Sequence, residues 1–62
     1  MVTINLRGPE GNAFSLIGQA RKYARQLDLD KNIITERMMS GNYENLLKVF
    51  EEYFGDYVTL ER

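Results

Sequence analysis

The chain has 62 residues, of which 44% are hydrophobic and 27% are charged, and its net charge is −1. This length has room for one domain, residues 1–62, and so small a domain buries only about 60% of the surface that its unfolded chain exposes. The sequence contains no cysteine and no histidine, which excludes a disulfide framework, a thiolate nucleophile, an imidazole base and a cysteine-based zinc site. We therefore expect no enzyme activity, no metal and no cofactor.

Residues 2–7 are predicted to form the first strand. Val2, Ile4 and Leu6 alternate with polar residues, a period of two that is typical of a strand with one buried face.

The next segment has the composition of a turn that leads into a helix. Pro9 suits the second position of a β-turn, and Gly11 is expected to adopt a positive φ. Asn12 is a good N-cap for the helix that follows.

The first helix is predicted from Ala13 to about residue 28. Its apolar residues recur at helical spacing and are Leu16, Ile17, Ala20, Tyr23, Ala24 and Leu27. Gly18 interrupts this helix at a cost of about 1 kcal/mol relative to alanine. Its presence indicates close packing against another element or against another subunit.

Two further helices and a strand complete the chain. Asp30 is expected to cap a short second helix that ends at Gly41 in the left-handed conformation. Asn42 begins a third helix, which Gly55 ends. Residues 57–60 alternate again and predict a last strand.

The element order βαααβ predicts an α+β fold in which the two terminal strands pair and the three helices cover one face of them. We expect the strands to run antiparallel, although the position of the short middle helix decides the direction. Such a sheet has two open edges, and two-stranded ribbons are marginally stable. Pairing between two copies would remedy this, so we expect a homodimer.

Charge is distributed unevenly along the chain. Residues 1–25 hold four cations against one acid, a balance of +3, and residues 26–62 hold eight acids against four cations, a balance of −4. This asymmetry can form a basic face for an anionic partner, or it can let two faces attract each other within the fold or across a symmetric dimer.

One candidate ligand site combines the turn with the basic end of the first helix. Backbone amides near Gly11 and Asn12 can bind an anion, and the cations that could assist are Arg7, Arg21, Lys22 and Arg25. The segment matches neither the Walker A pattern nor the dinucleotide fingerprint, and a turn with a helix cap explains it without a ligand. The small basic surplus disfavours nucleic acid as a partner.

A candidate partner surface lies around the second and third helices. Met38, Met39 and Tyr43, with Gly18, could form an adaptable apolar contact surface, and packing in the core is the alternative for the methionines.

Several segments resemble a known group of proteins. The turn GPEGNAF, the basic segment ARKYARQL and the central SGNYENLL look like those of a family of small uncharacterised proteins encoded by tailed bacteriophages. The resemblance covers nearly the whole chain. It implies a phage protein made in the cytoplasm of an infected bacterium, and it carries no activity with it.

These observations predict a non-enzymatic binding protein that acts as a homodimer and modulates a host or phage macromolecule. The alternative is a module that binds a nucleotide or another phosphorylated small ligand. The absence of a signal peptide or a long apolar run predicts a cytoplasmic protein without membrane association.

Overall fold

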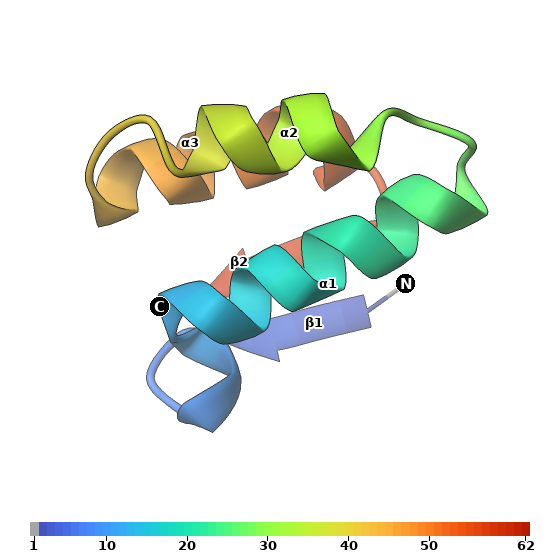
Figure 1. The fold of residues 1–62 in the computed structure, drawn as a ribbon. Helices are drawn as coiled ribbons and strands as arrows, with labels where there is room; N and C mark the ends of the chain where they lie inside the picture. The colour runs from blue at the N-terminus through green and yellow to red at the C-terminus, as the bar shows by residue number, and fades with distance from the viewer. Residues whose placement is uncertain (1) are drawn as a thin grey trace.

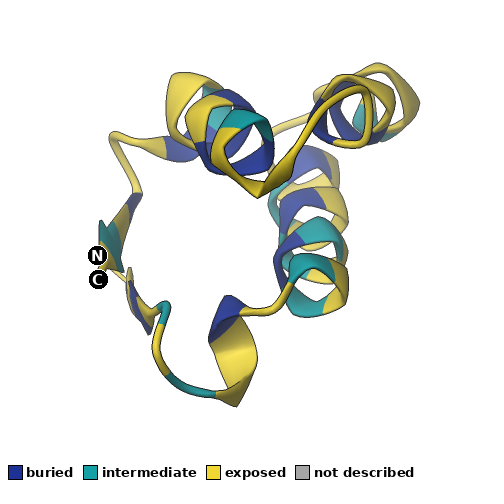
Figure 2. Cartoon of the chain, turned by 90° about the vertical axis from the view of Figure 1, so that its left-hand side faces the viewer, coloured by how far each residue is buried: buried dark blue, intermediate teal, exposed yellow. Residues whose placement is uncertain are grey.

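The computed structural model describes residues 2–62 and has the element order β1 (Val2–Asn5), η1 (Pro9–Gly11), α1 (Ala13–Gln26), α2 (Lys31–Met38), α3 (Tyr43–Phe54) and β2 (Val58–Glu61). The terminal strands form a two-stranded sheet, and the three helices lie on one side of it (Figure 2). The predicted α+β fold of order βαααβ is therefore confirmed.

The two strands run parallel, with Val2 opposite Val58 and Asn5 opposite Glu61. Our expectation of an antiparallel pair was wrong. Each helix reverses the direction of the chain, as the ribbon in Figure 1 shows. The chain reverses at each of the four connections between β1, α1, α2, α3 and β2, because α2 runs back along α1 rather than across it. An even number of reversals leaves β2 pointing the same way as β1.

The core lies between the sheet and the helices. All of its buried apolar side chains belong to one cluster, which includes Ile4 and Val58 from the strands and Phe50 and Phe54 from α3. The outer face of the sheet is polar and exposed, with Thr3 beside Thr59 and Asn5 beside Glu61. The alternation seen in the sequence therefore separates the core face of the sheet from the solvent face.

Both predicted helix caps are present, and Asn42, which was predicted to begin the third helix, caps it as well. The side chains of Asn12, Asp30 and Asn42 each accept a hydrogen bond from a backbone N–H in the first turn of the helix that follows. Such caps satisfy donors that have no partner within the helix. They explain why the starts of the helices were predictable residue by residue.

Gly55 caps the end of α3 as predicted, but other glycines differ from the prediction. No glycine has a positive φ among residues 2–62, so the left-handed conformations expected for Gly11 and Gly41 were wrong. Gly11 lies in the 3-10 turn η1, where an added Cβ would come within 2.2 Å of the Leu6 carbonyl oxygen. The chain needs glycine there because two backbone segments touch.

Gly18 does not pack against another element of the same chain. A Cβ added there would meet nothing within 4 Å, and the residue is exposed on α1. Of the two explanations that the sequence left open, contact with another element of the fold is contradicted.

Candidate protein-binding site

The residues proposed to bind a phosphorylated ligand lie at the two ends of α1. Gly11 and Asn12 immediately precede the helix, whereas Arg21, Lys22 and Arg25 are in its second half. A rise of 1.5 Å per residue separates Asn12 from Arg25 by about 20 Å along the helix. The structure therefore does not bring these residues together at one phosphate-sized site.

The polar groups of the turn are occupied by hydrogen bonds within the chain. The Asn12 side chain donates to the Pro9 carbonyl at 2.8 Å and accepts from the Ser15 N–H at 2.8 Å. The Gly11 N–H donates to the Gly8 carbonyl, and the Gly11 carbonyl accepts from the Tyr43 hydroxyl. These bonds explain the Gly-Pro-Glu-Gly-Asn segment as a structural turn.

The cations of residues 1–25 differ from those in the second half of the chain. Arg7, Arg21, Lys22 and Arg25 are exposed, and none of them makes an ion pair with any residue of 2–62. The Lys22 Nζ lies 6.0 Å from the centre of the Tyr23 ring. The positive charge of α1 therefore faces solvent.

Two arginines of the second half pair with glutamates of α3. Arg37 donates to both carboxylate oxygens of Glu52 and to the Tyr53 hydroxyl, and Arg62 donates to both oxygens of Glu44 at 2.8 and 2.7 Å. These hydrogen bonds lower the pKa of the Glu52 and Glu44 carboxyl groups and raise the pKa of the two guanidinium groups. Both pairs join α3 to another part of the fold.

Three of the four residues of the predicted partner surface line one shallow hollow of about 300 Å³. Met38 is fully buried beneath it, Met39 is 68% exposed, and Tyr43 is partly exposed. Gly18 does not line this hollow. Phe14 does, and it is 88% exposed, although sequence reasoning did not select it.

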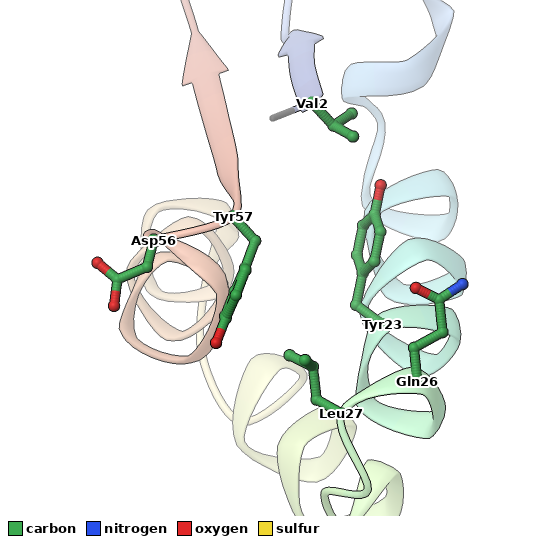
Figure 3. Close-up of a pocket in the computed structure, with 6 residues that line it drawn as sticks. All are labelled: Val2, Tyr23, Gln26, Leu27, Asp56 and Tyr57. Carbon is green, nitrogen blue, oxygen red and sulfur yellow. The ribbon is translucent and has the colours of Figure 1, made fainter.

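A larger hollow of about 330 Å³ lies at the opposite end of α1. It is lined by Val2, Tyr23, Gln26, Leu27, Asp56 and Tyr57. The rings of Tyr23 and Tyr57 stand on opposite walls with Leu27 between them, and the Asp56 carboxylate points away (Figure 3). The hollow is therefore lined mainly by the phenol rings of Tyr23 and Tyr57 and by the aliphatic side chain of Leu27.

Local structure holds the two tyrosines in place. Tyr23 belongs to the last turns of α1, and its ring packs against Phe54 with centroids 6.0 Å apart. Tyr57 lies in the connection from α3 to β2, where its N–H donates to the Phe54 carbonyl and its own carbonyl accepts from the Val2 N–H. The hollow thus rests on backbone that the core and the sheet fix.

Sequence reasoning assigned these residues to other roles. Tyr23 and Leu27 were counted in the apolar stripe of α1, and Tyr57 was the first residue of the last strand. No sequence signal pointed Tyr57 to this hollow, because its alternation with Val58 assigns it to the face opposite the core, whereas in the structure it precedes β2 and its ring faces Tyr23 of α1. For Phe14 the signal was its position outside the apolar stripe of its helix.

Among residues 2–62 there is no group of three or more acidic, histidine or cysteine side chains placed to hold a metal ion. Within the same residues, no helix is both long and apolar enough to cross a membrane.

Comparisons of the chain with protein-family models, with curated proteins and with solved structures found no match.

Proposed function

We propose that the protein is a non-enzymatic binding protein that acts as a homodimer and modulates a host or phage protein. The resemblance to proteins of tailed bacteriophages supports an activity in the cytoplasm of an infected bacterium. The partner contributes an apolar side chain, which enters the hollow between Tyr23 and Tyr57.

One observation carries this proposal: two tyrosines face each other across an open apolar hollow on the surface. Tyr57 is 52% exposed, and Leu27 and Val2 are also partly exposed beside it. Tyrosine is enriched among the residues that dominate binding energy at protein interfaces, because a large ring with a polar tip fills a pocket and keeps a hydrogen bond. Exposed apolar patches rimmed by polar residues often mark sites of protein–protein interaction.

The alternative, a phosphorylated small ligand, has less support. Gly11 and Asn12 precede α1, whereas Arg21, Lys22 and Arg25 lie in its second half. Neither these residues nor Arg7 lines the two hollows described above. The experiment below distinguishes a phosphorylated ligand from a protein partner.

The experiment compares three immobilised proteins as baits for proteins in a bacterial lysate. The hollow variant carries Leu27→Ser and Tyr57→Ser, and the basic variant carries Arg21→Gln, Lys22→Gln and Arg25→Gln. All five positions are exposed, so both variants are expected to fold, and circular dichroism checks this. We expect the basic variant to retain the wild-type partner and the hollow variant to retain at least tenfold less.

The reverse pattern contradicts the proposal. If the basic variant loses its partner while the hollow variant keeps it, the cations of α1 carry the binding. A steep decrease of capture with added salt would then identify a phosphorylated or nucleic-acid partner.

A further inference from the structure

The hollow between Tyr23 and Tyr57 has acidic residues at its opening. Asp56 is the only charged residue among those that line it, and its carboxylate points away from the space between the rings (Figure 3). Asp28 directly follows Leu27, another lining residue, after the end of α1. Both aspartates are exposed, and neither makes an ion pair within the part of the chain that the structure describes.

The cations of α1 do not neutralise this charge at the hollow. Arg21 and Arg25 lie two positions before and two positions after Tyr23, and two positions turn a helix by about 200°. Both arginines therefore lie on the side of α1 opposite to Tyr23. Lys22 is nearer, with its Nζ 6.0 Å from the centre of the Tyr23 ring, but it does not line the hollow. The C-terminal end of α1, which closes beside the hollow at Leu27, adds partial negative charge.

The hollow also offers hydrogen-bonding groups that the fold does not use. The Gln26 carboxamide and the Tyr57 hydroxyl belong to lining residues, and neither group makes a hydrogen bond within residues 2–62. A carboxamide both donates and accepts hydrogen bonds, so it can pair with the N–H or the C=O of a peptide backbone. A peptide segment can use these groups and the apolar walls together.

We propose that the partner is a protein segment in which a lysine or arginine lies close in sequence to the apolar side chain that enters the hollow. The inference rests on the proposed function and names the chemistry of the partner. The apolar side chain fills the space between Tyr23, Tyr57 and Leu27, and the basic side chain stays outside, where it is attracted to Asp56 and Asp28. Because the Asp56 carboxylate points away from the hollow, two different side chains of the partner make these contacts.

Selection from a library of short random peptides, with the immobilised protein as bait, tests this chemistry. We expect the enriched peptides to carry lysine or arginine near an aromatic or large aliphatic residue. They should bind the hollow variant at least about tenfold less tightly than the wild type, because the variant removes the apolar contacts at the centre of the site. Met39→Ser is the matched control, since it replaces an exposed apolar residue that lines the other hollow, and it should leave binding unchanged.

Charge variants of the protein, titrated with one enriched peptide, measure the role of the aspartates. Asp56→Asn should raise the Kd about two- to fivefold, the range expected for one exposed ion pair. Glu36→Gln removes an exposed acid of α2 that makes no ion pair within residues 2–62, and Lys22→Gln removes the cation beside Tyr23. Neither change should raise the Kd.

The same titration with a peptide whose basic residue is replaced by glutamine completes a double-mutant cycle. The effect of Asp56→Asn should disappear with this peptide, since the pair that the change breaks is then absent. If the peptides depend on the hollow but not on Asp56 or on their own charge, or if acidic peptides are enriched, the basic partner is wrong and the apolar hollow stands. If no enriched peptide depends on the hollow, the inference fails, and capture from lysate decides the proposed function separately.

Discussion

Asp28 is the one non-glycine residue among 2–62 with a positive φ, at 59°. It follows the end of α1, where the Leu29 N–H donates to the Ala24 carbonyl at 2.8 Å and the Asp28 N–H donates to the Arg25 carbonyl at 3.3 Å. This pair of bonds is a Schellman motif, which glycine most often completes. The left-handed cap that the sequence predicts at Gly41 therefore occurs instead at Asp28, after the end of α1.

Replacing Asp28 with glycine should stabilise the protein. The backbone of Asp28 is strained in the left-handed region because the residue has a Cβ atom, and the negative charge of its side chain is unfavourable near the C-terminus of a helix. We expect Asp28→Gly to raise the free energy of unfolding by about 0.5–1 kcal/mol, which raises the melting temperature by several degrees. Thermal unfolding followed by circular dichroism measures the shift.

Asp56→Gly is the control, because Asp56 is also exposed in a connection but has no positive φ. This change should give no increase in melting temperature. An equal increase in both variants would show that the gain at Asp28 comes from loss of an acid and not from relief of backbone strain.

At the scale of elements, α3 is joined to its neighbours by two ion pairs between exposed side chains. Glu52 pairs with Arg37 of α2, and Glu44 pairs with Arg62, which follows β2. The second pair connects the start of α3 with the end of the chain. Both arginines bind through two hydrogen bonds, which is the strongest geometry for such pairs.

Acid should remove the contribution of these pairs. The arginines hold the pKa of Glu44 and Glu52 below the ordinary value of 4.5, so the folded state binds protons less readily than the unfolded chain. The stabilisation is fully present above pH 4.5 and is lost as the pH falls through the lower pKa of the folded state. Urea unfolding at pH 7 and pH 3 should therefore show a smaller loss of stability for the double variant Glu44→Gln and Glu52→Gln than for the wild type.

The double variant Glu10→Gln and Glu36→Gln serves as the comparison, because neither glutamate makes an ion pair within residues 2–62. It should lose as much stability on acidification as the wild type does. The same reduced loss in both double variants would mean that general repulsion among charges, not the two ion pairs, governs the acid response.

For the molecule as a whole, the phenylalanines fall into two kinds. Phe50 and Phe54 are fully buried in the core, where their rings meet at a centroid distance of 5.2 Å, and Phe14 is almost fully exposed. A domain of this size has a total stability of about 3–9 kcal/mol. One buried ring is therefore a large part of the stability of the fold.

Phe54→Ala should remove about 3–5 kcal/mol of unfolding free energy, because it leaves a cavity against Tyr23 and Phe50. Phe14→Ala should change the stability of the monomer by less than about 0.5 kcal/mol. Urea unfolding at submicromolar protein concentration, where a dimer dissociates, measures both values. A large loss for Phe14→Ala under these conditions would show that its ring packs within the monomer.

The positions of the elements were largely determined by the sequence itself. The caps at Asn12, Asp30 and Asn42 act over two or three residues, so their effect can be recognised without knowing the fold. The alternation in the strands is equally local, although the ends shifted: β1 stops at Asn5 rather than at residue 7, and α1 stops at Gln26 rather than near residue 28. These ends depend on where the partner strand and the Schellman motif stop the element.

The tertiary structure decided the features that arise between elements. The parallel direction of the strands follows from how α2 lies against α1, and the need for glycine at position 11 comes from the nearby Leu6 backbone. The hollow between Tyr23 and Tyr57 joins residues 34 positions apart. Local patterns carry no information on such contacts, because the angle at which each connection turns the chain is set by packing in the core.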